Sequence, residues 1–378
     1  MTLRVLIIPD KFKGTLTARA AAAAIARGWR GARPDDFLEV LPMSDGGDGF
    51  GEVTSALLQA RSRRVKTVDA AHRSCAARWW WEPRTRTAII ESAAVIGLAM
   101  LPPKQFHPFQ LDTFGLGTLA RTAARKGATR CLIGIGGSAT NDAGFGLARA
   151  LGWRFLDSGG QTIEHWTGLH GLEHIRVPPR RRWFARCLVA TDVANPLLGP
   201  RGATRVYGPQ KGFRPQDFAL AERCLGRLAR VAARQFGRDI AREPGAGAAG
   251  GLGFGLMAFL GAELEPGFDL FARYAKLDRH LRAADLVVTG EGAVDRSTLM
   301  GKGVGQVAQW CRRSKVPCIA LAGVVGANRG IQAIFTQVHA LTDLTTVQQA
   351  KAQSAYWLER LAGRVARSAQ DAIARPRT

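Results

Sequence analysis

Five glycine-containing blocks of the sequence combine a flexible backbone with carboxylates, hydroxyls or lysines. Each one lies beside a predicted strand end or helix start. Exposed backbone N–H groups at such positions bind phosphate, and a nearby carboxylate can hold or orient a Mg²⁺ ion. The blocks are 10–15, 44–49, 134–142, 244–253 and 289–295. The chemistry they indicate is binding of a phosphorylated ligand together with a divalent cation.

The first two blocks bring charged groups to short turns. Asp10, Lys11 and Lys13 place a carboxylate and two ammonium groups before a predicted helix, which suits an anion and its metal. In the second block, Asp45 and Asp48 flank the paired glycines Gly46 and Gly47, so that the backbone can approach a ligand while oxygens face a hard cation. A capped strand–helix turn and a solvated turn are the alternative interpretations.

The third block is the strongest local signal. It contains Gly136, Gly137, Ser138, Asn141 and Asp142 between a predicted strand and a helix. Such a helix start offers N–H donors to phosphate, the hydroxyl adds another polar group, and the carboxylate suits Mg²⁺. A capped turn without ligand is the alternative.

The same block also fits a dinucleotide-binding pattern. Gly134, Gly136 and Ala139 match G-x-G-x-x-A, and Asp157 follows about 20 residues on. An NAD-type oxidoreductase that uses the Gly134–Ala139 loop is therefore a rival. Against it, Asp142 would lie beside the pyrophosphate, which is unfavourable without a metal.

The remaining blocks give weaker signals. Gly247 and Gly250 lie in a G-x-G-x-x-G pattern that follows a predicted helix rather than a strand, so the Rossmann context fails and close helix packing is the alternative. Glu291 and Asp295 follow a predicted strand, as does Asp192. Carboxylates at these strand ends could bind metal or act as a general base, and solvated loops are the alternative.

Apolar runs that alternate with helical patterns must position these blocks, and they predict an α/β fold with a largely parallel sheet. The predicted strands are Leu3–Ile8, Phe37–Leu41, Cys131–Ile135, Leu188–Asp192, Leu286–Thr289, Cys318–Ala322 and Val338–Leu341. The predicted helices are Thr15–Trp29, Gly117–Lys126, Phe218–Phe236, Leu252–Leu260, Gly303–Arg313 and Val347–Ala372, with one more after Asn141.

Two stretches interrupt this α/β rhythm. Arg63–Val68, Ala77–Trp81 and Thr87–Ser92 indicate hairpins of a smaller antiparallel element, and 151–185 indicates hairpins and loops. We therefore expect a doubly wound, largely parallel domain plus an inserted mixed α+β domain. The expected division is 1–60 with 283–378, with 111–150 as a further candidate part, against 61–110 with 151–282.

Composition narrows the class of protein. The 378 residues hold 53 Lys and Arg against 30 Asp and Glu, a formal net charge of +23. The basic residues are spread along the chain without a recognised nucleic-acid motif, so solvated surface charge is favoured over a nucleic-acid-binding protein. No apolar run approaches the length of a membrane-spanning helix. Six scattered cysteines without metal spacing indicate buried thiols and a cytoplasmic protein.

Taken together and in order, the blocks resemble the bacterial-type glycerate kinase family, the glycerate kinase I group. The resemblance extends over nearly the whole chain. It is carried by 8–14, 43–49, 91–93, 136–142, 192–203, 207–212, 244–254 and 289–292. It implies ATP- and Mg²⁺-dependent phosphorylation of D-glycerate, usually to 2-phosphoglycerate. It also implies two α/β domains with the active site in the cleft between them.

The placement of these residues at strand ends and helix starts suggests how they divide the chemical roles. We expect Asp192, Asp295 and Lys13 to be catalytic, the two aspartates as candidate bases and the lysine as a charge stabiliser. Asp142 and Glu291 are the expected metal ligands. The expected substrate- and phosphate-binding residues are Asp10, Lys11, Asp45, Gly46, Gly47, Gly136, Gly137, Ser138, Asn141, Lys211, Gly247 and Gly250. The expected partners are glycerate and ATP, with no specific nucleic acid and no membrane; the oligomeric state is left open.

Four positions depart from the family pattern. The family usually has Ser where this chain has Lys11, Glu where it has Asp48, Arg where it has Ala293, and Gln where it has Ser297. A missing arginine removes a bidentate clamp for phosphate or carboxylate. Either Lys11 or Arg296 compensates, or the enzyme is a kinase of a related hydroxy acid.

Overall fold

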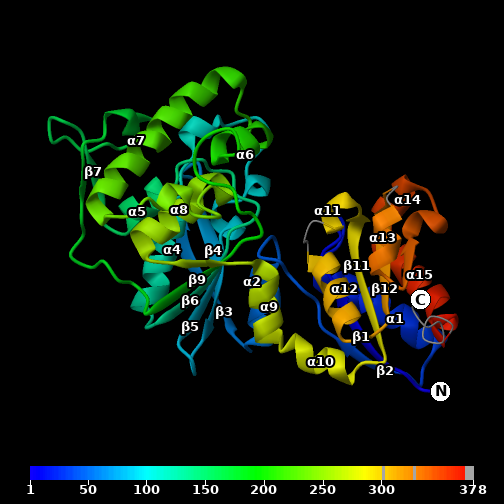
Figure 1. Ribbon diagram of the computed structural model, residues 1–378. Helices are drawn as coiled ribbons and strands as arrows, with labels where there is room; N and C mark the ends of the chain where they lie inside the picture. The colour runs from blue at the N-terminus through cyan, green and yellow to red at the C-terminus, as the bar shows by residue number, and fades with distance from the viewer. Residues whose placement is uncertain (300–302, 327–328, 371–378) are drawn as a thin grey trace. The chain divides into compact units, whose positions relative to one another are not determined.

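The structure is a computed structural model that describes residues 1–299, 303–326 and 329–370. The chain divides into two compact units, Met1–Asp45 with Phe268–Thr378, and Gly46–Gly267. The first unit is therefore discontinuous in sequence, and the second is inserted into it. Both units combine helices with parallel strands, so the chain has an α/β fold (Figure 1).

The described part of the first unit is built on a five-stranded sheet in which every neighbouring pair is parallel. The strand order is β13-β12-β11-β1-β2. The strands are β1 (Arg4–Pro9), β2 (Phe37–Val40), β11 (Leu286–Val294), β12 (Cys318–Val325) and β13 (Gln337–Ala340). Successive residues of β1 are buried on both faces, which explains its continuous apolar run.

Helices cover both faces of this sheet. One face packs against α1 (Ala18–Ala32) and α15 (Ser354–Arg367), and the other contacts α10 (Leu277–Ala283) and α12 (Gly303–Arg313). The alanine-rich face of α1 allows the close approach of α15: a Cβ on Gly28 would lie 2.0 Å from the carbonyl oxygen of Glu359. The other helices of the unit are α9 (Gly267–Ala275), α11 (Arg296–Leu299), α13 (Arg329–Ile334) and α14 (Val347–Ala352).

The second unit contains a six-stranded mixed sheet of order β10-β9-β6-β5-β4-β3. The strands are β3 (Arg61–Val68), β4 (Ser74–Glu82), β5 (Thr87–Glu91), β6 (Arg130–Gly134), β9 (Arg186–Ala190) and β10 (Glu263–Glu265). The hairpin pairs β3·β4 and β4·β5 are antiparallel, whereas β5, β6, β9 and β10 run parallel. Beside this sheet, β7 (Arg154–Leu156) and β8 (His174–Arg176) form a two-stranded antiparallel ribbon.

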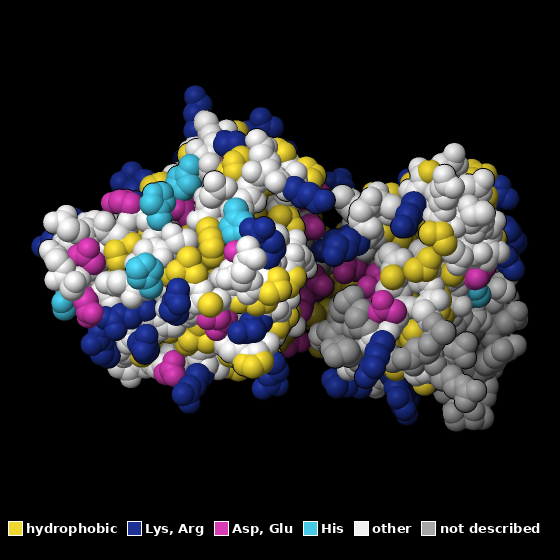
Figure 2. Space-filling model, turned by 90° about the horizontal axis from the view of Figure 1, so that it is seen from above, with side chains coloured by type: hydrophobic (Ala, Val, Ile, Leu, Met, Phe, Trp, Pro, Cys, Tyr) yellow, Lys and Arg dark blue, Asp and Glu magenta, His cyan; other side chains and the backbone are white. Residues whose placement is uncertain are grey.

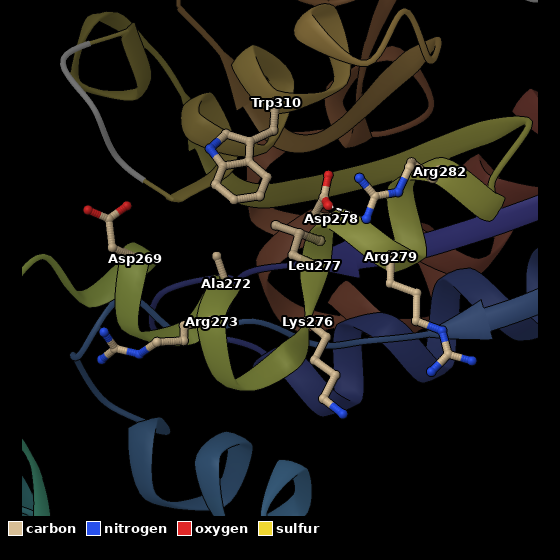
Figure 3. A pocket seen from close by; sticks show the side chains of 9 residues that line it. All are labelled: Asp269, Ala272, Arg273, Lys276, Leu277, Asp278, Arg279, Arg282 and Trp310. Carbon is tan, nitrogen blue, oxygen red and sulfur yellow. Dashed lines mark ion pairs between the residues drawn. The ribbon is translucent and has the colours of Figure 1, made fainter.

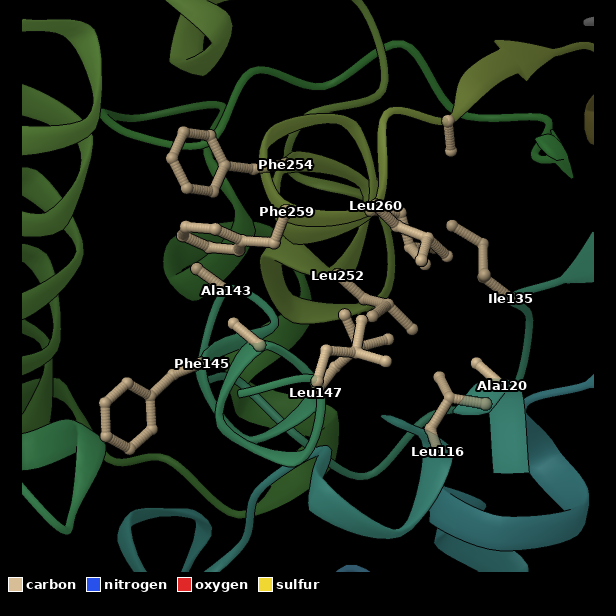
Figure 4. Packing of buried hydrophobic residues seen from close by; sticks show 14 of the residues in the cluster. Leu116, Ala120, Ile135, Ala143, Phe145, Leu147, Leu252, Phe254, Phe259 and Leu260 are labelled. Atoms are coloured by element: carbon tan, nitrogen blue, oxygen red, sulfur yellow. The ribbon is translucent and has the colours of Figure 1, made fainter. Parts of the chain in front are cut away.

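The helices of the second unit enclose a large apolar core. They are α2 (Phe50–Leu57), α3 (Ala93–Ile96), α4 (Phe114–Arg125), α5 (Phe145–Ala150), α6 (Ala203–Lys211), α7 (Phe218–Phe236) and α8 (Ala248–Leu260). Phe145, Leu147, Leu252 and Phe259 from α5 and α8 lie close together in this core (Figure 4). The core fixes the starts of α5 and α8, which the glycine-rich blocks precede.

Several elements differ from the sequence expectations. Residues 62–101 do not form a separate antiparallel element, because β5 pairs in parallel with β6 and joins the hairpin to the main sheet. Strand β11 continues to Val294, because its ladder with β12 extends through Glu291 and Ala293. The predicted helix 347–372 is interrupted at Gln353, between α14 and α15, and its last two residues lie outside the described residues.

The domain boundaries also differ. Residues 46–60 belong to the second unit, because α2 packs on β4 and β5. Residues 111–150 lie there too, since they contain β6, a central strand of the six-stranded sheet. Residues 268–282 belong instead to the first unit, where α10 contacts β1.

The surface and the cysteines agree with a dispersed basic charge and reduced thiols. Figure 2 shows Lys and Arg side chains scattered over the visible face rather than gathered into one stripe. All six cysteines are free; five are buried and Cys75 is half-buried. In the described part of the chain, no helix is both long and apolar enough to cross a membrane.

The contact between α1 and α15 leads to a stability prediction. We expect Gly28→Ala to lower the free energy of unfolding by about 2 kcal/mol, because its Cβ must displace the backbone at Glu359. Urea denaturation of the full chain measures this. Gly31→Ala, on the same helix with nothing within 4 Å of its Cβ, is the control; it should be neutral or stabilising by up to about 1 kcal/mol. Equal effects of the two changes would contradict this account of the packing.

Candidate functional site

Three carboxylates gather at the carboxyl edge of the parallel sheet in the first unit. Asp10 follows β1, Asp45 lies beyond β2, and Glu291 lies in β11, the other neighbour of β1. The backbone N–H of Asp10 donates to the Gly290 carbonyl at 2.8 Å, which holds the end of β1 against β11. Ligand sites of open parallel sheets form at this edge. The strands thus bring together three acidic residues that lie far apart in sequence.

The electrostatics of this acidic cluster are unusual. Asp10 is 8% exposed. Burial first, and then the charges of Asp45 and Glu291, raise the pKa of Asp10 to about 7, despite the opposing effects of Lys11 and its backbone N–H. Loss of water and like-charge repulsion both disfavour the ionised carboxyl. The repulsion among these oxygens is what a bound divalent cation would relieve, and carboxylate oxygens are ligands that Mg²⁺ prefers.

The predicted lysines lie on the loop that follows β1. Lys13 is exposed, and Lys11 is half-buried beside Asp10. A Cβ on Gly292 would lie 3.1 Å from the backbone nitrogen of Lys13, so the glycine in β11 leaves room for the backbone of this loop. An exposed ammonium group next to a carboxylate cluster is suited to contact an anion that reaches the same edge.

Thr298 links two of the predicted carboxylate positions. Its hydroxyl donates to Glu291 Oε1 at 2.7 Å and accepts from the backbone N–H of Asp295 at 3.2 Å. Thr298 is fully buried, so it fixes the orientation of Glu291. The sequence analysis missed this residue; its spacing of three from Asp295, as in a helix cap, was the available signal.

In the second unit, glycines allow the predicted loops to lie against one another. The N–H of Gly136 donates to the Gly46 carbonyl at 3.2 Å. A Cβ on Gly136 would lie 2.6 Å from Gly47 Cα, and one on Gly137 would lie 2.5 Å from Asp48 Oδ1. The loop after β6 and the loop before α2 are thus in backbone contact.

The glycine-rich turn at the start of α8 joins them. Ala249, Gly250 and Gly251 all have positive φ, so α8 opens with a left-handed turn. The hydroxyl of Ser138 donates to the Ala249 carbonyl at 2.9 Å. A Cβ on Gly250 would lie 1.9 Å from the Thr140 carbonyl oxygen, and one on Gly247 would lie 2.2 Å from the Pro196 carbonyl. Only residues without a side chain fit at these two positions.

Asp142 and Asn141 are deeper than the sequence suggested. Both are fully buried. Asp142 Oδ2 accepts hydrogen bonds from the Thr113 N–H and hydroxyl and from the Gly146 N–H. Burial and Asp112 raise the pKa of Asp142 to about 6. These bonds hold α4 and α5 together, so the geometry does not fit the expected metal ligation by Asp142; Asn141 likewise bonds inward, to Thr204 at 3.0 Å.

Lys211 is also buried, although we expected it to face phosphate. Only 6% of the residue is exposed. Its Nζ donates to Ser138 Oγ at 3.1 Å and to the Thr140 carbonyl at 2.7 Å. Burial lowers the pKa of Lys211 to about 7, with Asp142 acting in the opposite direction. Lys211 therefore contacts the glycine-rich loops from the protein interior and not from the solvent side.

Two further carboxylates end strands of the second unit. Asp192 is exposed beyond β9, and its Oδ1 accepts from the Gly267 N–H at 3.0 Å. Glu91 ends β5, and its two oxygens accept from the N–H groups of Gly49 and Gly51 at 3.1 and 2.9 Å, at the start of α2. Glu91 thereby ties the second block to the sheet. It lies in one of the family-like blocks but was not assigned a role.

The dinucleotide alternative fails on structural grounds. Asp157 follows β7, which pairs antiparallel with β8 instead of lying next to β6 in the parallel sheet. Its Oδ1 accepts from the N–H groups of Gly159 and Gln161, so it stabilises a local turn. A dinucleotide-binding site needs the ribose-binding carboxylate at the end of a strand that lies next to β6. Strand β7, which precedes Asp157, is not such a strand.

A separate cavity of about 480 Å³ lies in the first unit, between α9, α10 and Trp310 of α12. Figure 3 shows that the side chains of Arg273, Lys276 and Arg279 point away from Trp310, whereas Asp278 and Arg282 form an ion pair with each other. None of the predicted site residues lines it. Among the described residues, no three or more His, Cys, Asp or Glu side chains are grouped so that they could hold a metal ion by themselves.

The fold defines an α/β protein whose glycine-rich loops lie at strand ends and helix starts, and comparisons with known proteins give its family. The model of the glycerate kinase family matches residues 5–370. The chain is 37% identical to a glycerate kinase of Halalkalibacterium halodurans, covering 91% of this chain and 93% of that one. It is 36% identical to the glycerate 2-kinase of Escherichia coli, covering 92% and 93%.

A solved structure agrees. The crystal structure of a protein described as glycerate kinase 2 from Salmonella typhimurium LT2 superimposes on this chain with a TM-score of 0.84. The two chains are 34% identical, and the match covers 98% of this chain and 99% of that one. The chain belongs to the glycerate kinase family, and it is a kinase.

The acidic cluster predicts a pH dependence of stability. Because the pKa of Asp10 in the folded protein, about 7, exceeds its unfolded value, the folded state binds more protons between about pH 4 and pH 7. This contribution therefore weakens stability as pH rises through that window, by roughly 4 kcal/mol at most. Asp10→Asn should remove it, so that the variant gains stability over wild type as pH rises from 5 to 8 in urea titrations without metal.

Adding Mg²⁺ at pH 8 tells whether the loss of stability comes from repulsion in the acidic cluster or from a general effect of pH. Wild type should gain thermal stability and Asp10→Asn should gain much less, because the cation replaces the missing proton. Asp278→Asn, an exposed carboxylate of the same unit paired with Arg282, is the control and should behave as wild type. Parallel pH curves for wild type and Asp10→Asn would contradict the raised pKa.

Proposed function

We propose that this kinase transfers the γ-phosphoryl group of ATP to a hydroxyl of D-glycerate, with Mg²⁺, and that 2-phosphoglycerate is the product. Membership of the glycerate kinase family carries this proposal. The relative in Escherichia coli is a glycerate 2-kinase, which favours the 2-position. We further propose that the substrates meet in a cleft between the two units, where both sets of loops would serve one reaction.

The glycine-rich loops of the second unit are the proposed phosphate site. Gly136 and Gly137 lie against the 46–48 turn, and Gly250 opens α8. Side chains are excluded from these positions, so the loops consist mainly of backbone groups. The Gly136 N–H already donates to the Gly46 carbonyl, and other backbone groups of the loops would face the ligand. Gly46, Gly47, Gly247, Ser138 and Asn141 shape these loops.

Mg²⁺ is the proposed cofactor, and when bound it would neutralise negative charge on the phosphate groups. Asp10, Asp45 and Glu291 supply oxygen donors, and the raised pKa of Asp10 reflects repulsion that a cation relieves. Mg²⁺ usually retains waters and substrate phosphates among its ligands, so an incomplete set of protein ligands fits it. Asp142 is left out because its oxygens already accept hydrogen bonds from Thr113 and Gly146.

The reaction needs little covalent help from the protein. A glycerate hydroxyl oxygen forms a bond to the γ-phosphorus while the bond from that phosphorus to the bridging oxygen of ADP breaks, and the hydroxyl proton passes to a base. Asp192 and Asp295 are the candidate bases because both follow a strand at a carboxyl edge. Lys13, which is exposed, and Lys11, which is half-buried, are the groups proposed to offset charge on the transferring group and on substrate.

Which hydroxy acid the kinase phosphorylates is a separate question from its class of reaction. Ala293 stands where the family usually has arginine, and it lies in β11 two residues beyond Glu291. A guanidinium clamp for phosphate or carboxylate is thus missing at this position. A related hydroxy acid is the alternative substrate that this departure favours.

The test is a direct assay of the full chain with Mg·ATP. D-Glycerate should give ADP release, and ³¹P NMR of the product should show 2-phosphoglycerate rather than the 3-isomer. L-Glycerate, glycolate, D-lactate and tartronate make up the comparison panel. ADP release with another acid and none with D-glycerate would overturn the substrate assignment while leaving the kinase intact.

Substitution of the candidate bases tests the division of labour. Asp192→Asn or Asp295→Asn should lower kcat about a hundredfold or more, because a positioned base is lost, with the thermal midpoint almost unchanged. Asp239→Asn, an exposed carboxylate paired with Arg242, is the control. Wild-type turnover in both variants would show that neither is the base and would direct attention to Asp10, Asp45 and Asp48.

A further inference from the structure

Lys211 presents an energetic problem that the proposed chemistry does not solve. The end of its side chain is enclosed by the loop after β6 and the turn of α8, and its two hydrogen bonds are to neutral oxygens. In the described part of the chain Lys211 forms no salt bridge, and the charge of Asp142 offsets only part of the effect of burial. A buried ammonium group without a counter-ion is strongly unfavourable, so the charge needs a partner that arrives from outside or a proton that leaves.

The position of Lys211 connects it to both loops. Ser138 Oγ donates to the Ala249 carbonyl and accepts from Lys211, so one hydroxyl joins the lysine to the α8 turn. A Cβ on Gly250 would lie 2.8 Å from Nζ. The ammonium group therefore packs against the left-handed turn and holds the Ser138–Thr140 segment against it.

The polar atoms beside it are incompletely satisfied. In the described part of the chain, Thr140 Oγ1 and Asn141 Oδ1 are buried without a hydrogen-bond partner. Buried polar atoms of this kind are uncommon in folded proteins and often mark functional sites. They lie on the loop that Lys211 holds, next to the one carboxylate whose field acts on the lysine, Asp142. The neighbouring α8 turn contributes only alanine and glycine there.

We propose that Lys211 is a positioning residue that acts through Ser138 and Thr140 to hold the two glycine-rich loops, and that it takes up a proton when nucleotide phosphate binds to them. This inference rests on the proposed function. An anion on the loops supplies the missing negative charge and favours the ammonium form. In the free protein, burial lowers the pKa of Lys211 to about 7, so much of the lysine is neutral above that pH.

Proton uptake can be measured without catalysis. Metal-free ADP is titrated into the full chain by calorimetry at pH 7.5, in two buffers of different ionisation enthalpy. Wild type should take up about three quarters of a proton, from the fraction of a group of pKa about 7 that is neutral at that pH. ADP affinity should fall as pH rises from 7 to 9.

Two variants separate charge from titration. Lys211→Arg keeps the charge but does not titrate in this range, so uptake should approach zero and affinity should become flat with pH. Lys211→Met should weaken ADP binding about tenfold or more. Ser138→Ala keeps the titrating group, so it should weaken binding less and retain the uptake. Lys126→Met, an exposed lysine on another helix end, is the control.

The outcomes distinguish failure of the proposed role of Lys211 from failure of the proposed kinase function. Undiminished proton uptake in Lys211→Arg, or unchanged ADP affinity in folded Lys211→Met, would overturn the role of Lys211 while leaving the kinase intact. If Lys211→Arg does not fold, the Lys211→Met and Ser138→Ala pair decides, because uptake must vanish in the first and persist in the second. A wild-type protein that does not bind ADP would overturn the proposed nucleotide site, and this inference with it.

Discussion

The arrangement of the second unit depends on backbone segments approaching one another closer than any side chain permits. Gly136 lies against Gly47, Gly250 against Thr140, and Gly144 of the α5 start against Gly255 of α8, each at a distance where a Cβ would collide. These contacts bring the ends of β6, the start of α2 and the start of α8 to one place. Because these contacts exclude side chains, the surface that the three segments form consists largely of backbone peptide groups. That is the kind of surface on which phosphate is bound.

Such close packing forces polar groups into the interior, and the protein satisfies most of them with short local networks. Asp142 accepts bonds from two segments at once, and Thr113 both donates to it and accepts from the Leu147 N–H. In the first unit, Thr298 serves Glu291 and the Asp295 backbone in the same way. A single buried oxygen can therefore set the orientation of two site segments. These residues shape the candidate site without facing a ligand.

The sequence predicted the fold, the family and the types of residue at the site better than it predicted which of those residues are buried. The α/β fold, the family and the order of glycine-rich blocks followed from periodicity and motif spacing, because both depend on local sequence. Whether a carboxylate faces solvent or the interior depends on long-range packing. Asp142 and Lys211 matched a phosphate-binding pattern yet lie buried, whereas Asp192 and Lys13 are exposed. The parallel pairing of β5 with β6, and the extent of β11, likewise depend on distant strands and left no local signal.

Each unit carries a group whose charge its own surroundings do not balance, and the two imbalances have opposite sign. In the first unit, crowding of acidic oxygens favours a protonated Asp10. In the second, burial among neutral atoms favours a deprotonated Lys211. In the proposed function, the metal would supply a counter-charge to the acidic cluster around Asp10, and the nucleotide phosphate would supply one to Lys211. Electrostatic preorganisation of this sort stabilises the charge that develops during phosphoryl transfer. On that proposal, the cost of the two unbalanced groups in the free protein favours ligands that bring a counter-charge to each of them.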